Sequence, residues 1–209
     1  GMIGAAAALV ALVAVWRPVG GRLDGRVTVV ARHSTWEPSN RPYDTKAYGE
    51  DVSYSYKVIY DYCRQFYDMS RLLESEAIDD AALRDCDVLV VKVPTSPFGS
   101  DEVDAILRFV QRGGGLLLIG DHTNVFKSSS HLNDIARPLG FSYRHDLLYT
   151  IGSPFLEAFR PGLLPHAAVQ HVPPMQFAVT CSIDPGTSRG RSVVEGAGLW
   201  NLPPVYNTD

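Results

Sequence analysis

Titratable side chains follow several of the apolar segments that read as strands. Those that stand where a strand would end are His33, Asp121, His122, His145 and Asp146. If the strands are parallel, their carboxyl ends share one edge of the sheet, so these side chains can approach a common cleft. Imidazole and carboxylate groups are metal ligands and also general acids and bases. The sequence therefore offers His33, His122 and His145 as candidate metal ligands, and His122 with Asp121 as candidate catalytic residues.

Neither role is fixed by a local motif. No HExxH or HxH pair places two ligands on one element, and no sequence signature identifies a cofactor. A histidine at a strand end more often caps a helix or bonds a loop carbonyl, and Asp121 and Thr123 could simply order their turn through its backbone. Metal binding and acid–base catalysis are therefore hypotheses that stand beside a purely structural alternative.

A broader set of polar residues lies at the same predicted edge. Thr95 and Ser96 follow an apolar run, and Asn124 comes two residues after His122. In an open α/β sheet, ligands bind in the crevice beyond the carboxyl ends of the strands. We therefore expect a ligand-binding cleft there, with the polar and aromatic loop from Trp36 to Tyr48 as its lid. The expected cleft residues are His33, Thr95, Ser96, Asp121, His122 and Asn124.

The segment from Asp87 to Asn124 has the pattern of one strand–helix–strand unit. Val88–Val91 and then Val93 form an apolar run without polar alternation, as in a strand that is covered on both faces. Apolar residues then recur at i, i+3, i+4 and i+7 from Val103 to Val110, with Ser100 as the predicted N-cap. Asp101 and Glu102 complement the positive end of the helix dipole. Glycines end this helix, and the apolar run Leu116–Ile119 follows. Two buried strands joined by a helix predict a parallel sheet.

Similar patterns on both sides of this unit predict an α/β domain over residues 26–150. The further expected strands are Val27–Ala31, Met69–Leu73 and Phe141–Tyr143, and the further expected helices are Val52–Tyr67, Asp79–Arg84 and His131–Arg137. Prolines interrupt residues 151–209, so we predict an irregular, loop- and strand-rich extension there. Only Gln176–Ile183 and Arg191–Glu195 read as strands in it. We expect the chain to be truncated at this end.

Residues 1–17 contain a charge-free apolar run, Met2 to Trp16. A complete bilayer span needs about 20 apolar residues, so the run is short for one. Its alanine-rich composition, its terminal tryptophan and the arginine beyond it fit a helix that leaves a membrane, whereas a buried helix of a soluble protein is the alternative. We predict a membrane anchor at the cell membrane, followed by a linker over residues 18–25. Other membrane-protein subunits are then candidate partners.

Composition and motifs exclude several classes of protein. The 209 residues carry 19 Lys and Arg and 23 Asp and Glu, so the net charge is −4 and nucleic acid is not an expected partner. Three separated cysteines suggest buried thiols rather than a zinc knuckle or a disulfide framework. No serine lies in a GxSxG turn, and no phosphate-binding loop connects a strand to a helix.

The central stretch resembles a known group of proteins. The order VLVVKVPTSP, amphipathic helix, RGGGLLLIGD and following helix is similar to the class I glutamine amidotransferase-like superfamily, especially its non-amidotransferase branches in membrane-associated bacterial proteins. The resemblance covers roughly Arg26 to Tyr149. It implies a flavodoxin-like three-layer sandwich with a mainly parallel central sheet.

The residues that carry amidotransferase chemistry in this superfamily are missing here. Active members hold a cysteine nucleophile in a GxCxG turn, and His122 stands at the cysteine position with Asn124 at the second glycine. The later His-x-Glu pair is also missing, because neither His166 nor His171 is followed two residues on by a glutamate. Without a thiolate no thioester forms. The resemblance therefore implies that glutamine hydrolysis is absent.

Two functional hypotheses remain. The first is a membrane-anchored domain that lacks the catalytic cysteine and binds a small ligand or a protein partner through the strand-end cleft. The second is a hydrolase of a polar or carbohydrate substrate, with His122 as the general base, Asp121 beside it, and a metal ion as a further possibility.

Overall fold

The computed structural model describes residues 23–36, 38–42, 56–152, 157–161, 175–177 and 179–203, together with Gly4 and Lys46. The predicted N-terminal helix over residues 1–17 therefore lies outside the described residues apart from Gly4. So do residues 37, 43–45, 47 and 48 of the predicted lid. In the described part of the chain, no helix is long and apolar enough to cross a membrane.

The centre of the structure is a four-stranded parallel sheet in the order β2-β1-β3-β4. Its strands are β1 (Arg26–Val30), β2 (Asp68–Leu72), β3 (Val88–Lys92) and β4 (Gly115–Ile119). The four predicted strands of this sheet therefore form, and most of their ends differ from the prediction by one residue. Because β1 pairs with β2 on one side and with β3 on the other, the chain changes its winding direction between β1 and β3. Such a switch point leaves a crevice at the carboxyl ends of the strands.

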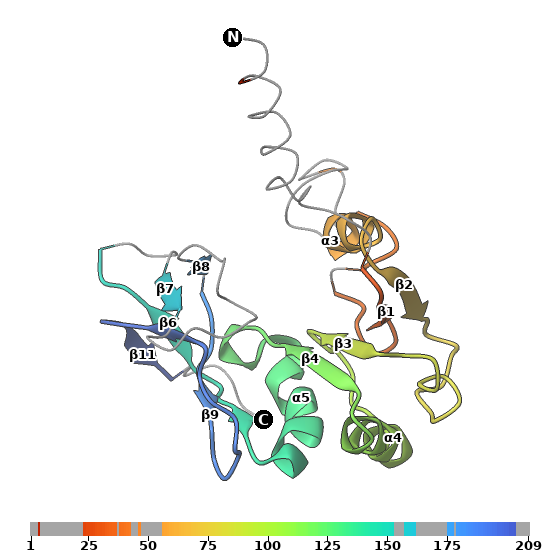
Figure 1. Cartoon of the computed structure of the whole chain (residues 1–209). Coiled ribbons are helices and arrows are strands. Elements are labelled where there is room, and N and C mark those ends of the chain that lie inside the picture. Colours follow the sequence, from red (N-terminus) through yellow and green to blue (C-terminus); the bar gives the residue numbers. More distant parts are fainter. Residues whose placement is uncertain are drawn as a thin grey trace.

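Helices cover both faces of this sheet. Figure 1 shows α3 (Tyr56–Cys63) on one side and both α4 (Ser100–Gln111) and α5 (Ser128–Ala136) on the other. The N-cap of α4 is Gly99, one residue before the expected Ser100. Short 3-10 segments precede and follow α5, as η1 (His122–Lys127) and η2 (Arg137–Leu139).

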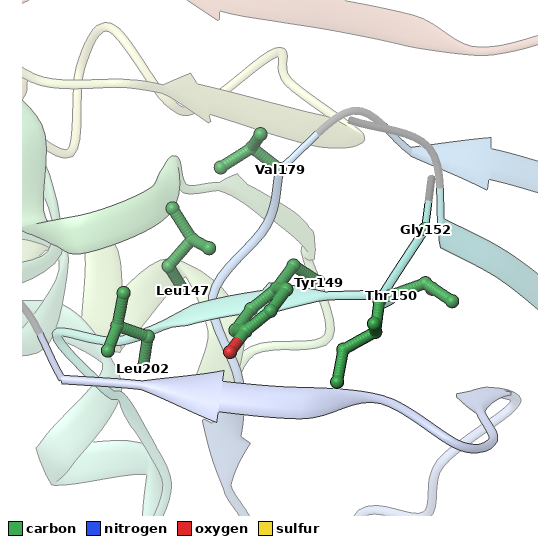
Figure 2. Close-up of a pocket in the computed structure, with 7 residues that line it drawn as sticks. Leu147, Tyr149, Thr150, Gly152, Val179 and Leu202 are labelled. Atoms are coloured by element: carbon green, nitrogen blue, oxygen red, sulfur yellow. The ribbon is translucent and has the colours of Figure 1, made fainter. Parts of the chain in front are cut away.

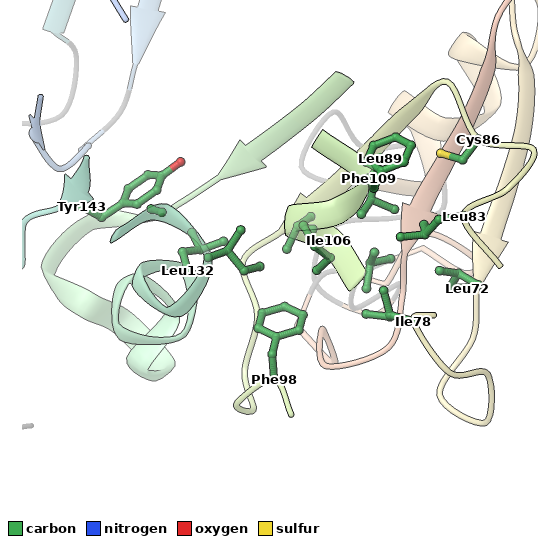
Figure 3. Close-up of a cluster of buried hydrophobic side chains, with 14 residues drawn as sticks. Leu72, Ile78, Leu83, Cys86, Leu89, Phe98, Ile106, Phe109, Leu132 and Tyr143 are labelled. Carbon is green, nitrogen blue, oxygen red and sulfur yellow. The ribbon is translucent and has the colours of Figure 1, made fainter. Parts of the chain in front are cut away.

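The core lies between the sheet and the helices α4 and α5. Ile106 and Phe109 of α4 and Leu132 of α5 are at most 1% exposed, and they belong to one cluster with Leu89 of β3 (Figure 3). The 3.6-residue period read from the α4 sequence therefore marks the face that is buried. Burial of this face fixes the helix, and with it the residues at its N-terminus, against the sheet.

The predicted helix Asp79–Arg84 is wrong, because this segment forms only turns. Its backbone carries one i→i+4 bond, from the Leu83 N–H to the Asp79 carbonyl, while the Asp79 side chain accepts from the Ala82 N–H. An aspartate that accepts from the N–H three residues on caps the start of a helical turn, so this segment makes one capped turn that does not continue into a helix.

The predicted strand Phe141–Tyr143 is not part of the parallel sheet. It shortens to β5 (Ser142–Tyr143), which pairs antiparallel with β9 (Ile183–Asp184). The buried side chain of Asn133 binds both the N–H and the carbonyl of Tyr143, at 2.8 and 3.0 Å. This backbone is therefore held by α5 and not by β4.

The remaining strands form small antiparallel sheets. β6 (Leu147–Tyr149) pairs with β11 (Trp200–Leu202), and β7 (Glu157–Pro161) pairs with both β8 (Met175–Phe177) and β10 (Val194–Gly196). The predicted strand Gln176–Ile183 is interrupted, since Val179 has a φ of 59°. Likewise, Arg191–Glu195 becomes a strand only from Val194.

Candidate functional site

The loops after β1 and β3 meet at the switch point of the sheet. His33 follows β1 with a left-handed backbone (φ 65°), and its carbonyl accepts hydrogen bonds from the N–H and the Oγ1 of Thr95, at 2.6 and 3.2 Å. Val93, at the end of β3, also has a positive φ of 32°. Positive φ is costly for a β-branched residue and is often found where a site demands it.

The His33 side chain joins three elements. Its Nδ1 lies 2.9 Å from the Oγ of Ser96, in the loop after β3, and its Nε2 lies 2.9 Å from a carboxylate oxygen of Glu102, in the first turn of α4. The Arg32 guanidinium binds the other oxygen of Glu102 at 2.7 Å. We call Arg32, His33, Ser96 and Glu102 the His33 cluster. The side chains of His33 and Glu102 are only 12% and 13% exposed.

The contacts of Glu102 fix the protonation of the cluster. Burial raises the pKa of Glu102, but the Gly99 N–H bond at 2.9 Å and the side-chain bonds from Arg32 and His33 together leave it below its usual range. An ionised carboxylate only accepts hydrogen bonds, so we assign a proton to Nε2 of His33. Nε of Arg32 also lies 3.2 Å from this nitrogen, but it lies closer to Glu102, at 2.7 Å. In the neutral ring Nδ1 is then the acceptor, and the Ser96 hydroxyl donates to it.

A buried lysine lies beside the cluster. Lys92, the last residue of β3, is 1% exposed and donates to the Oγ of Ser34 at 2.7 Å and to the carbonyl of Trp36 at 3.3 Å. Its ammonium also lies 4.8 Å from the centre of the Tyr56 ring. These bonds tie the start of the predicted lid to the sheet.

The loop after β4 has a strained backbone. In η1 the φ angles of Thr123, Asn124, Phe126 and Lys127 all lie between 49° and 59°. Several non-glycine residues in the left-handed region are uncommon and together cost several kcal/mol, on the order of 1–2 per residue. The loop is therefore held by the contacts around it.

The predicted residues of this loop are mainly bonded to the loop itself. Asp121 accepts from the backbone N–H of His122 at 2.7 Å, while Nδ1 of His122 lies 2.7 Å from the hydroxyl of Thr123. The Asn124 side chain binds the N–H and the hydroxyl of Ser130, both at 2.9 Å, and so orders the first turn of α5. Asp121 thus has the turn-ordering role that the sequence left open.

The Nε2 of His122 lies 3.8 Å from Asp121, which is beyond hydrogen-bond distance. His122 and Asp121 are both partly exposed, so their assignment as general base and orienting carboxylate stays a prediction.

Asp146, one of the two residues predicted at the end of β5, is bonded to the C-terminal part of the chain. Asp146 is 5% exposed and accepts bonds from the N–H and the hydroxyl of Ser182, at 2.8 and 2.5 Å, and from Asn201. It therefore links β6 to the C-terminal strands. Among the described residues, no group of three or more His, Cys, Asp and Glu side chains could hold a metal ion. Both ring nitrogens of His33, a candidate ligand, are engaged within the cluster.

Two hollows lie near these elements. One, of about 480 Å³, lies at the carboxyl ends of β1 and β2, and its lining includes Ser34, Thr35, Arg41, Glu74 and Ser75. The other, of about 410 Å³, has an apolar lining along β6 and β11 that includes Leu147, Tyr149, Val179 and Leu202 (Figure 2). The first hollow adjoins the His33 cluster, because Thr35 bonds Thr95 and Arg32 binds the carbonyl of Glu74.

An aromatic contact connects the two strand-end loops. The rings of Trp36 and Phe126 are 4.7 Å apart, which joins the loop after β1 to η1. Trp36 was predicted to belong to the lid, and in the structure its ring packs against Phe126 of η1. The rest of the lid from Tyr43 to Tyr48, apart from Lys46, lies outside the described residues.

Arg32 and Glu102 were not among the site residues predicted from the sequence. Glu102 had been assigned only to the first-turn charge of the helix. The sequence does carry a usable signal, because the helix begins directly after the loop that contains Ser96. Its first turn must therefore lie at the carboxyl edge of the sheet, near the residue that follows β1.

The thiols offer no alternative nucleophile near this edge. Burial raises the pKa of Cys181 to about 11, with the nearby Asp146 carboxylate adding to the shift, and burial also raises the pKa of Cys63. A reactive thiol needs a lowered pKa.

No known protein family matches this chain, and no curated protein matches it either. A solved structure titled "mmIFT52 N-terminal domain" has a similar fold, with a TM-score of 0.56 and 12% sequence identity. The match covers 81% of this chain and 72% of that one. At this identity the likeness concerns the fold alone.

Proposed function

We propose that this chain is a binding module of flavodoxin-like fold that takes a small polar ligand at the carboxyl edge of its parallel sheet. The observation that carries the proposal is the hollow of about 480 Å³ at the ends of β1 and β2, beside the switch point. Its lining supplies the hydroxyls of Ser34, Thr35 and Ser75 and the cation of Arg41. Such groups suit a ligand with hydroxyl or carboxylate oxygens.

The sequence supports a further assignment to the glutamine amidotransferase-like superfamily, in a branch without amidotransferase activity. The strand order 2-1-3-4 agrees with the first four strands of the flavodoxin-like order 2-1-3-4-5. At the position of the family's cysteine stands His122, bonded to Thr123. Incubation with glutamine should therefore release no ammonia above the level of a buffer blank, and enzyme-dependent release would contradict this part of the proposal.

Ligand binding is tested by thermal unfolding with a panel of monosaccharides and small carboxylates. The expected result is a concentration-dependent rise in Tm for one member of the panel. Ser75→Trp would fill the hollow from an exposed position of its wall and remove that rise. Gln65→Trp, exposed beyond α3, serves as the matched control and should retain it. An equal rise in both variants would place the binding site elsewhere.

The membrane part of the proposal rests on the charge-free run Met2 to Trp16. We propose that this run anchors the domain at the cell membrane, where membrane-protein subunits are candidate partners. The full chain should co-sediment with phospholipid vesicles, whereas a variant that starts at Leu23 should stay in the supernatant. Equal sedimentation of the two would contradict an N-terminal anchor.

A further inference from the structure

The arrangement of His33, Ser96 and Glu102 goes beyond ligand binding. The Ser96 hydroxyl, in the loop after β3, lies 2.9 Å from Nδ1 of His33, in the loop after β1. Nε2 of His33 lies 2.9 Å from the Glu102 carboxylate, in the first turn of α4. A nucleophile within hydrogen-bond reach of a base, with that base oriented by a third group, is the signature of nucleophilic catalysis. We propose that Ser96 is the nucleophile of a serine esterase site, with His33 as its general base and Glu102 as the residue that orients His33.

The tautomer of His33 suits this role. The N–H at Nε2 donates a hydrogen bond to Glu102, so the unprotonated Nδ1 can take the proton of the Ser96 hydroxyl. In the serine-protease triad the serine faces Nε2 and the carboxylate faces Nδ1, so the two ring nitrogens are exchanged here. The roles of the three groups are the same, and such sites are recognised by roles and geometry. The ring is also held in place by an edge contact with Phe98, at 4.8 Å between centres.

The surroundings of Ser96 allow a substrate to approach. Ser96 is partly exposed, as is Thr95, and Pro97 is exposed. Ser96 also lies at the switch point of the sheet and a few residues before the N-terminus of α4.

The reaction that these groups support is ester hydrolysis in two steps. The Ser96 Oγ bonds to the acyl carbon of a small ester while its proton moves to Nδ1 of His33. The bond from that carbon to the alcohol oxygen breaks, and the alcohol leaves with the proton from His33. Water then attacks the acyl carbon while His33 takes one of its protons. The bond from that carbon to Oγ of Ser96 breaks, Oγ takes the proton back from His33, and a carboxylic acid and free Ser96 are released.

The test is phosphonylation by a fluorophosphonate, a reagent that marks activated serines, followed by peptide mass spectrometry of the full chain. We expect the phosphonate on Ser96 of the folded wild-type protein and not on the exposed Ser192. His33→Gln should slow this labelling by about 10²–10⁴-fold, the usual contribution of a general base. Glu102→Gln should slow it at least about tenfold, and Ser192→Ala should leave it unchanged.

A second measurement follows p-nitrophenyl acetate hydrolysis, where wild type should release p-nitrophenolate in a burst that Ser96→Ala lacks. Wild-type protein whose Ser96 is labelled no faster than Ser192 would overturn the proposal without any variant needing to fold. Labelling of Ser96 that is unchanged in folded His33→Gln would overturn it too. Neither result depends on the hollow, so ligand binding there stands or falls separately.

Discussion

Replacement of Glu102 by glutamine is the sharpest perturbation of the strand-end site. The carboxylate accepts bonds from Arg32 at 2.7 Å, from His33 at 2.9 Å and from the Gly99 N–H at 2.9 Å. The amide of glutamine keeps one acceptor oxygen, but its NH₂ group faces a donor where the second oxygen was. Hydrogen bonds to a charged group contribute about 1.5–3 kcal/mol each. With Arg32 partly exposed, we expect Glu102→Gln to lower the free energy of unfolding by about 2–4 kcal/mol.

The matched control is Asp101→Asn, one residue earlier in the same first turn. Asp101 is exposed and lies at the same helix terminus, so its replacement should cost less than about 1 kcal/mol, the usual value of a charge beside the dipole. Urea unfolding of the three proteins at neutral pH measures both differences, provided that the slope with denaturant is unchanged. Equal midpoints for the two variants would refute the reasoning, because the loss would then reflect helix charge alone.

The same experiment has a defined pH dependence. The folded-state pKa of Glu102 is lowered from its ordinary value of 4.5. A carboxyl group with a lowered pKa contributes its stabilisation above its unfolded-state pKa and loses it as the pH falls through the folded-state value. The difference between wild type and Glu102→Gln should therefore be full at neutral pH and shrink below about pH 4.5. A difference that stays constant down to pH 3 would contradict the ionised carboxylate.

Two further predictions concern the frame of the site. Asn133→Leu should lower the free energy of unfolding by about 2–5 kcal/mol in urea titrations, because it leaves the buried N–H and carbonyl of Tyr143 without their partner; a loss below about 0.5 kcal/mol would contradict the clamp on β5. The side-chain and backbone bonds from Arg26 lower the pKa of Asp87 to about 2. Arg26→Ala removes only the side-chain bonds, so in an NMR titration the pKa of Asp87 should rise toward its usual value of about 4 without reaching it. An Asp87 that titrates identically in both proteins would exclude the ion pair.

The sheet was predictable because its central strands, β1 and β3, are largely buried. Continuous apolar runs such as Val88–Val91 have few alternatives to a buried strand, so β1, β3 and β4 were located to within a few residues. The fifth strand was misplaced for a reason that lies outside its own sequence. Asn133 of α5, the helix that precedes this segment, forms hydrogen bonds with the N–H and the carbonyl of Tyr143.

The site was predictable in position but not in partners. His33 and Ser96 were both expected at the strand ends, and the structure joins them directly. Glu102 was assigned to its own helix, because a first-turn glutamate normally complements the dipole. Which carboxylate reaches which histidine depends on the packing of α4 against the sheet. Sequence periodicity gives the buried face of that helix but not its axial position.

The state of the His33 ring tests the central arrangement most directly. Long-range ¹H–¹⁵N correlation spectra distinguish a protonated ring nitrogen from an unprotonated one, and His33→Gln assigns the signals. At a pH where the ring is neutral, we predict a proton on Nε2, bonded to Glu102, and an unprotonated Nδ1 that accepts from Ser96. A neutral ring with its proton on Nδ1 would contradict the account, because Ser96 could then neither donate to His33 nor be activated by it.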